Sequence, residues 1–345
     1  MHVLTSRLSP ITLRRLAAFK ANRRARISLW LFGILFIISL FAELIANDKP
    51  IVMQYDGQWY VPLLVDYPET EFGGFLPTRA DYLDPFIQQQ ISDHGWALWP
   101  IIPYSYDTPV ERSGAAPLPP NGQNLLGTDG TKRDVLARVI HGFRLSIIFT
   151  LIVTGAASLI GIIAGAVQGF FGGWTDLIFQ RVIEIWTSTP SLYVIIIMFA
   201  ILGRSFWLLV FLLVLFSWTS LVGVVRAEFL RARNLEYVRA ARALGVGNMT
   251  IMFRHMLPNA MVAMLTMLPF IITGTISTLA ILDFLGFGLP SSAPSLGELT
   301  LQAKQNLQAP WLAFTAFFTF AIMLSLLIFI FEGIRDAFDP RKTFS

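Results

Sequence analysis

Six runs of mostly apolar residues dominate the pattern of hydrophobic and polar positions along the chain. Each run has about 20 residues or more, the length of helix that crosses the roughly 30 Å hydrocarbon core of a bilayer. The runs cover residues 27–46, 145–168, 177–202, 206–225, 260–282 and 311–331. With 54% hydrophobic and only 14% charged residues, the chain carries more apolar side chain than one soluble core can bury. The pattern predicts an all-α membrane protein with six transmembrane helices.

The placement of charge predicts how these helices are oriented. Residues 1–26 carry seven Lys or Arg and no acidic residue, so the positive-inside rule places this tail in the cytoplasm. Six crossings return residues 333–345 to the cytoplasm as well. The loop of residues 226–258 agrees, because it holds six Arg against two Glu, whereas the loop of residues 283–310, predicted outside, has Lys304 as its one base. We expect a bacterial inner-membrane protein with a retained first helix, because the first run lacks the small-x-small cleavage site of a signal peptide.

Residues 47–144 form a large predicted periplasmic insert between the first two transmembrane helices. This segment has twelve acidic and seven basic residues, and residues 50–120 show no strong periodicity, so no fold is assigned to them. Near its end, Thr131 and Asp134 have capping-box spacing, and the apolar residues that follow recur at helical intervals. We expect an amphipathic helix over residues 131–144 along the outer membrane surface. The alternative is an early start to the second span.

Small residues, prolines and a charge pair mark the middle spans. The small residues repeat every four positions in the second span, which predicts close helix packing: Ala157, Gly161, Gly165 and Gly169. Pro190 and Pro269 predict bends in the third and fifth spans. Arg181 and Glu184 are three residues apart, and we interpret them as a structural ion pair. Asp176 is expected in a loop or at a helix cap.

The most informative stretch lies in the loop of residues 226–258. It reads EYVRAARALG at residues 236–245 and, after nine further residues, HMLPN at residues 255–259. Its alanines favour a helix with little surface relief, and Gly245 suits a left-handed helix stop. Pro258 suits the first turn of the next span. The pattern predicts a short, rigid helix that can dock on a partner protein.

This loop resembles the signature of the permease family of binding-protein-dependent ABC importers, which is Glu-Ala-Ala, three residues, Gly, nine residues and Ile-x-Leu-Pro. The matching residues are Ala240, Ala241, Gly245, Leu257 and Pro258. Arg239 replaces the Glu and His255 replaces the Ile, two departures that are usual in the dipeptide and oligopeptide branch. Similarity to that branch extends to GTDGTKRDV at residues 127–135, DFLGFG at residues 283–288 and RDAFDPR at residues 335–341. The long insert looks like that of permeases for larger peptides and for the antibiotic microcin C.

The resemblance implies the type I ABC importer permease fold, with a permease core at residues 145–332. It also implies a second permease subunit in a heterodimer, two ATPase domains or one fused ATPase chain, and a periplasmic solute-binding protein. The ATPase-coupling helix would comprise Arg239, Ala240, Ala241, Arg242, Ala243, Leu244 and Gly245, and the loop exit His255, Leu257 and Pro258. ATP and Mg would bind to the partner ATPase. In support, none of the five lysines follows a glycine, so the chain has no Gly-Lys-Ser/Thr phosphate loop.

Two other classes of function remain open. A stand-alone secondary transporter or channel predicts ionisable residues at mid-membrane and often repeated halves, and neither is evident. A membrane enzyme needs a catalytic set, yet the chain has no cysteine and its four histidines lack metal-binding spacing. We therefore predict no catalytic, cofactor or metal site and no nucleic-acid partner, only lipid and protein partners. Polar candidates for the translocation path are Ser217, Thr219, Thr266, Thr273 and Ser277.

Overall fold

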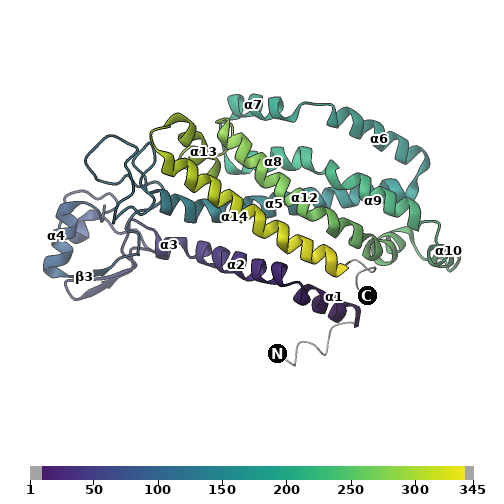
Figure 1. The fold of residues 1–345 in the computed structure, drawn as a ribbon, viewed down its shortest axis with the longest axis horizontal. Coiled ribbons are helices and arrows are strands. Elements are labelled where there is room, and N and C mark those ends of the chain that lie inside the picture. The colour runs from purple at the N-terminus through teal and green to yellow at the C-terminus, as the bar shows by residue number, and fades with distance from the viewer. Residues whose placement is uncertain (1–9, 339–345) are drawn as a thin grey trace.

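The computed structural model of the protein describes residues 10–338, in which long helices lie side by side and a small sheet gathers at one end (Figure 1). Its helices are α1 (Pro10–Ala21), α2 (Arg23–Leu40), α3 (Ala42–Ile45), α4 (Pro85–His94), α5 (Val135–Phe171), α6 (Gly173–Thr187), α7 (Ser191–Leu202), α8 (Phe206–Ser217), α9 (Thr219–Ala232), α10 (Glu236–Ala243), α11 (Asn248–Thr250), α12 (Leu257–Phe284), α13 (Leu296–Gln305) and α14 (Pro310–Phe338), with a 3-10 turn η2 (Glu69–Phe72) and a π-helical segment η3 (Ile251–Met256). Residues 1–9 and 339–345, which contain Arg7 of the basic tail and residues 339–341 of the C-terminal motif, lie outside the described residues.

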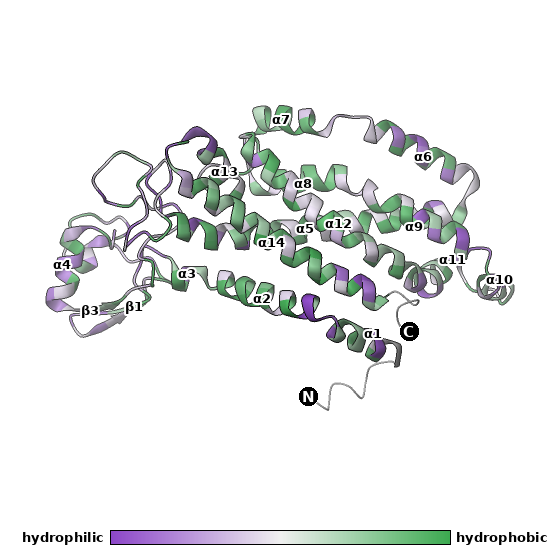
Figure 2. Ribbon diagram, in the orientation of Figure 1, coloured by the Kyte–Doolittle hydropathy of each residue, from purple (hydrophilic) through white to green (hydrophobic). Residues whose placement is uncertain are grey.

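Several described helices are long and apolar enough to cross a membrane. Four such segments are α5, α8 with α9, α11 through α12, and α14. A fifth is the pair α6 and α7, which is bent by 66° where Pro190 caps α7, so the bend predicted there is confirmed. Pro269 lies inside α12, which continues past it. Figure 2 shows hydrophobic residues along these helices and more hydrophilic ones in α4 and at the bundle ends. The first predicted span, residues 27–46, is divided between α2 and α3 and is not among these segments, so the six predicted spans are not all confirmed. Three of the first four residues of α2 are arginines.

The helix α5 corrects the prediction for the end of the insert. It runs unbroken for 37 residues, so residues 131–144 form no separate amphipathic helix. Its N-cap is Asp134, whose Oδ1 accepts a hydrogen bond from the Ala137 N–H at 2.8 Å. Thr131 is instead held in the preceding turn, where its N–H and hydroxyl both donate to Oδ1 of Asp129 at 2.8 Å. The early start to the second span is therefore the correct alternative, because no proline interrupts the helical hydrogen bonding after Asp134.

A small folded unit occupies the part of the insert to which the sequence pattern assigned no fold. Its antiparallel sheet has the order β2-β1-β3, with β1 (Val52–Tyr55), β2 (Gln58–Tyr60) and β3 (Gly95–Leu98). Asp56 and Gly57 have φ angles of 47° and 76°, the positive values that a tight two-residue hairpin turn requires. This Asp-Gly pair was a local signal for the hairpin. The buried residues of the unit are Met53, Tyr55, Phe72, Ala80, Tyr82, Ile87 and Ile91.

The charged residues at the start of the third predicted span form two ion pairs. Arg181 and Glu184 make the predicted pair at 2.5 Å, and both side chains are exposed. Asp176 lies in the first turn of α6, so its assignment to a loop or cap was wrong. Its two carboxylate oxygens accept from Arg226 of α9 at 2.5 and 2.6 Å. This second pair ties the start of α6 to α9.

The small-residue stripe of α5 packs against the α8–α9 segment. A Cβ atom on Gly161 would lie 2.4 Å from the carbonyl oxygen of Trp218, and one on Gly165 would lie 2.7 Å from that of Val222. Gly169 meets α9 just as closely. Real Cβ atoms do not approach other atoms so closely, so only glycine lets the two backbones meet here. The packing role predicted for the stripe is confirmed.

We expect Gly165→Ala to lower the melting temperature of the purified protein, because the new methyl group must push α5 and α9 apart at a cost of about 1–3 kcal/mol. Gly155→Ala is the matched control, since a Cβ there would have no atom within 4 Å and alanine favours a helix. Thermal unfolding in detergent measures both variants. Equal melting temperatures would contradict close packing at Gly165.

Candidate functional site

The helix α10 lies at the end of the bundle farthest from the sheet and buries one face only (Figure 1). Val238 is fully buried and packs in a cluster with residues of α5, α9, η3 and α12. Most of the remaining surface is exposed, including Arg239, Ala240, Arg242, Ala243 and the C-cap residue Leu244. Leu244 is 82% exposed, which is unusual for so large an apolar side chain. The short helix predicted here thus exists, is held in the bundle by Val238, and leaves the rest of its surface exposed, whereas its docking on a partner stays a prediction.

The C-terminus of α10 has a fixed stop. Gly245 has a φ of 76°, so the left-handed conformation predicted for it is confirmed. Its N–H donates to the carbonyl of Arg242 at 3.0 Å, and the N–H of Val246 donates to that of Ala241 at 3.0 Å. These two bonds form a Schellman motif, and Val246 and Ala241 pack against the same cluster as Val238. The exposed face of α10 is therefore rigidly placed.

The exit from the loop joins α10 to α12. The π-helical segment η3 continues directly into α12, and Pro258 lies in the first turn of α12 as predicted. His255 is partly buried, and its carbonyl accepts from Nδ2 of Asn259 at 3.1 Å. The same Nδ2 donates to the Tyr237 hydroxyl of α10 at 3.5 Å. Leu257 is partly buried against the cluster that contains Val238. A displacement of α10 would therefore act on α12.

Two grooves lie beside α12. The first has a volume of about 370 Å³ and lies between α12 and the α8–α9 segment. Its lining consists of Leu213, Ser217, Ser220, Met267, Phe270, Ile271, Gly274, Thr275 and Thr278. The second has a volume of about 280 Å³ and lies between α12 and α14. Its lining consists of Thr266, Pro269, Phe270, Thr273, Ile328, Phe331, Glu332 and Arg335.

These grooves separate the five residues predicted for the translocation path. Ser217 lines the first groove, whereas Thr266 and Thr273 line the second. Thr219 and Ser277 line neither groove, and the hydroxyl of each donates to a backbone carbonyl of its own helical segment. The structure therefore does not bring the five residues into one path.

The sequence pattern did not point to three hydroxyl residues of the first groove. Ser220 follows Ser217 by three residues, and Thr278 follows Thr275 by three. Residues three apart share a helix face, so this spacing was the signal that could have found them. The first groove has four hydroxyl side chains and no charged one, whereas the second has two hydroxyl side chains and the charged side chains of Glu332 and Arg335.

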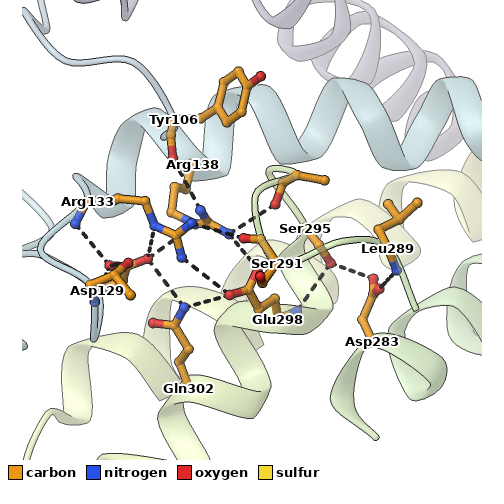
Figure 3. A network of polar contacts seen from close by, with 12 residues as sticks. Tyr106, Asp129, Arg133, Arg138, Asp283, Leu289, Ser291, Ser295, Glu298 and Gln302 are labelled. Atoms are coloured by element: carbon orange, nitrogen blue, oxygen red, sulfur yellow. Dashed lines mark hydrogen bonds and ion pairs between the residues drawn. The ribbon is translucent and has the colours of Figure 1, made fainter. Parts of the chain in front are cut away.

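A buried network of charges lies at the sheet end of the bundle (Figure 3). Arg133 Nε donates to Asp129 Oδ2 at 2.8 Å, and Arg138 Nη2 donates to Glu298 Oε2 at 2.8 Å. Arg133 Nη2 also reaches Glu298 Oε1 at 3.3 Å. The side chains of Asp129 and Arg138 are fully buried, and two positive charges balance two negative ones. The network joins the motif of residues 127–135 to α13.

Neutral groups extend this network. Arg138 donates to the backbone carbonyls of Tyr106 at 3.2 Å and Ala293 at 3.1 Å. Gln302 Nε2 donates to Glu298 Oε1 at 2.9 Å.

Burial disfavours the charged form of Asp129, but Arg138 and Arg133 outweigh this effect and hold the pKa of the Asp129 carboxyl below its ordinary value. Within residues 10–338, no group of three or more His, Cys, Asp or Glu side chains is arranged to hold a metal ion.

The second motif, DFLGFG, ends α12 in a tight polar turn beside this network (Figure 3). Asp283 Oδ1 accepts from the Leu289 N–H at 2.7 Å, and its Oδ2 accepts from the Ser295 hydroxyl at 2.5 Å. A Cβ on Gly288 would lie 1.8 Å from Asp283 Oδ1, and one on Gly297 would lie 2.5 Å from the Asp283 Cβ. Both glycines are therefore needed for Asp283 to join α12 to α13.

We expect Glu298→Ala to destabilise the protein by about 3–5 kcal/mol, because it leaves Arg138 buried with too little negative charge beside it. Glu184→Ala is the control, since it breaks an exposed ion pair of the kind worth about 1 kcal/mol or less. The measurement is thermal unfolding of both purified variants. A loss no larger for Glu298→Ala than for Glu184→Ala would show that the network adds nothing to stability.

Long apolar helices, a helix exposed on one face and hydroxyl-lined grooves together define a helical membrane permease. The chain belongs to the family described as "Binding-protein-dependent transport system inner membrane component", whose family model matches residues 157–344. Residues 13–62 match a second family model, "N-terminal TM domain of oligopeptide transport permease C". These matches confirm the resemblance based on the loop, and they disfavour a stand-alone secondary transporter or channel.

Relatives match almost the whole chain. The chain is 58% identical to "Peptidoglycan transport system permease protein YejE" of Agrobacterium fabrum, over 97% of this chain and 94% of that protein. It is 55% identical to "Inner membrane ABC transporter permease protein YejE" of Escherichia coli, over 98% of this chain and 99% of that protein. Among solved structures, an inward-facing MetNI methionine ABC transporter matches 59% of this chain and 96% of its own, with a TM-score of 0.48 and 16% identity.

Proposed function

We propose that this chain is the membrane-spanning subunit of an ATP-driven importer that moves peptides or peptide-like compounds by alternating access. Family membership supports the importer, and the match of residues 13–62 to an oligopeptide permease domain supports the peptide. The relative named for peptidoglycan transport supports substrates that contain cell-wall peptides. Microcin C stays a prediction within the same chemical class.

The proposed membrane topology has six crossings, made by α2, α5, the bent pair α6–α7, α8–α9, α11–α12 and α14. The end of the bundle that carries α1 and α10 is cytoplasmic, and so are both termini. Support comes from the arginines and lysine of residues 14–26 and the six arginines of residues 226–258, which lie at this same end (Figure 1). The acidic insert with its small sheet is then periplasmic.

The proposed coupling site is the exposed face of α10. The single observation that carries this proposal is that α10 buries Val238 while Leu244 stays 82% exposed at the tip of the chain's most basic loop. A cytoplasmic ATPase, as two subunits or one fused chain, would cover this face and supply the ATP and Mg. A second permease would complete the pore, and a periplasmic binding protein would deliver the solute.

In the proposed mechanism, motion of the ATPase is transmitted from α10 to α12. The ATPase moves α10 as a rigid body, because its Schellman motif and the buried Val238 hold its shape. The contact between Asn259 and Tyr237, together with η3, passes this motion to α12. One face of α12 lines the first groove with hydroxyl groups, so rotation of α12 would change the polar surface offered to the solute.

We expect Leu244→Glu to abolish ATPase association and peptide uptake, because it puts a charge on the exposed C-terminal end of α10 without altering a buried contact. The measurement is co-purification of the ATPase with the permease pair, together with uptake in cells. Leu307→Glu is the matched control, since Leu307 is 85% exposed at the other end of the bundle and should leave ATPase association intact. Normal association of Leu244→Glu would refute docking at α10.

We expect Thr278→Leu to reduce peptide uptake several-fold while ATPase association persists, because it replaces a hydroxyl in the first groove with a larger apolar side chain. The neighbouring Ser277→Leu is the control. Both residues are exposed on α12 and both hydroxyls donate to the carbonyl four residues back, but only Thr278 lines the groove. Equal loss of uptake in the two variants would show that the groove is not the solute path.

A further inference from the structure

An open groove of about 480 Å³ lies directly beside α10. Its lining consists of Phe170, Phe171, Arg233, Asn234, Arg242 and Asn248. These residues come from the C-terminal end of α5, the C-terminal end of α9, α10 and the start of α11. The groove therefore lies where four elements meet, next to the face that α10 leaves exposed.

Two arginines of this groove form no ion pair within the described residues. Arg233 is close enough to Asp176 to interact with it electrostatically, but both carboxylate oxygens of Asp176 accept hydrogen bonds from Arg226. Arg226 is paired with Asp176, and Arg231 is paired with Glu228. By contrast, Arg233 and Arg242 form no ion pair with any of residues 10–338, although both reach the same small groove. Like charges in one groove repel each other, so this arrangement is unfavourable until an anion binds.

Local contacts hold both guanidinium groups in place. The Arg242 guanidinium lies 5.0 Å from the centre of the buried Phe170 ring, in a cation–π contact. Arg233 lies against the turn between α5 and α6, where a Cβ on Gly172 would be 2.0 Å from its Nη1 atom. Gly172 has a φ of 62°, so this close approach depends on glycine for two reasons. The donors are thus positioned before any partner arrives.

A simpler role for the two arginines is to offset the negative ends of the helix dipoles, because Arg233 caps α9 and Arg242 lies in the last turn of α10. An arginine in this role commonly donates hydrogen bonds to the last backbone carbonyls of its helix. Within residues 10–338, neither guanidinium makes such a bond. The dipole effect therefore leaves their donors available to a ligand.

We infer that this groove receives a carboxylate side chain of the ATPase subunit, and that the ATPase surface around it is acidic. The inference rests on the proposed docking of α10 and names the chemistry of the partner. A guanidinium presents paired N–H donors that match a carboxylate, and Asn234 and Asn248 add amide groups beside them. The rest of the loop adds to the positive field, since Arg239 and Arg254 are also unpaired within the described residues.

The test is the double variant Arg233→Gln with Arg242→Gln, in the permease pair reconstituted with its ATPase. We expect binding of the ATPase to weaken by roughly tenfold or more at low salt, the scale of one close charge pair. We also expect the salt dependence of binding to become much shallower. Arg23→Gln with Arg24→Gln is the matched control, because it removes two exposed charges at the same end of the bundle but outside the groove, and it should bind as the wild type does.

Three results would overturn the inference. The first is that the groove variant binds the ATPase with the affinity and salt dependence of the wild type. The second is that the control variant loses as much ATPase affinity as the groove variant, which would indicate a general electrostatic field rather than a site. The third is loss of binding to vesicles of anionic phospholipid with ATPase binding unchanged, which would make the groove a headgroup site. If Leu244→Glu abolishes ATPase binding in the same assay while the groove variant does not, docking at α10 stands and only the carboxylate contact is lost.

Discussion

The close approach of α5 to α9 is the constraint on which the rest of this molecule depends. Glycines at positions 161, 165 and 169 let the two backbones meet where a methyl group would clash. The chain passes from α9 almost directly into α10, and Phe229 of α9 packs in the same cluster as Val238 of α10. The position of the exposed face of α10 is therefore set by packing inside the bundle.

Different kinds of interaction stabilise the two ends of the bundle. At the α10 end, apolar packing and a Schellman motif fix the structure, and several arginines are left unpaired within the described residues. At the sheet end, buried charges of both signs balance one another, and glycines beside Asp283 admit its hydrogen bonds. A buried charge is stable only when it is paired, so opposite charges are brought together at the sheet end, whereas the unpaired arginines at the α10 end remain accessible to solvent.

The helix α12 connects these two ends. Its first turn follows η3 and contacts α10 through Asn259, and its last turn holds Asp283 in the polar turn before α13. Between them, its two faces line separate grooves against α8–α9 and α14. A single element thus contacts α10, lines the groove that has four hydroxyl side chains and holds the polar turn beside the buried charge network.

The sequence by itself determined the features that depend on neighbours along the chain. The length of the apolar runs indicated membrane helices, because a chain in hydrocarbon must satisfy its own backbone hydrogen bonds. The end of α10 at Gly245 followed from local backbone geometry. Tertiary structure alone decided the pairing of Arg138 with Glu298, which are 160 positions apart, and the assignment of Thr266 and Thr278 to opposite grooves. It also decided the fold of the insert and brought Arg233 and Arg242, neither of which forms an ion pair within residues 10–338, to one groove. These features arise from contacts between distant residues, and a pattern read along the chain carries no information about which distant residues meet.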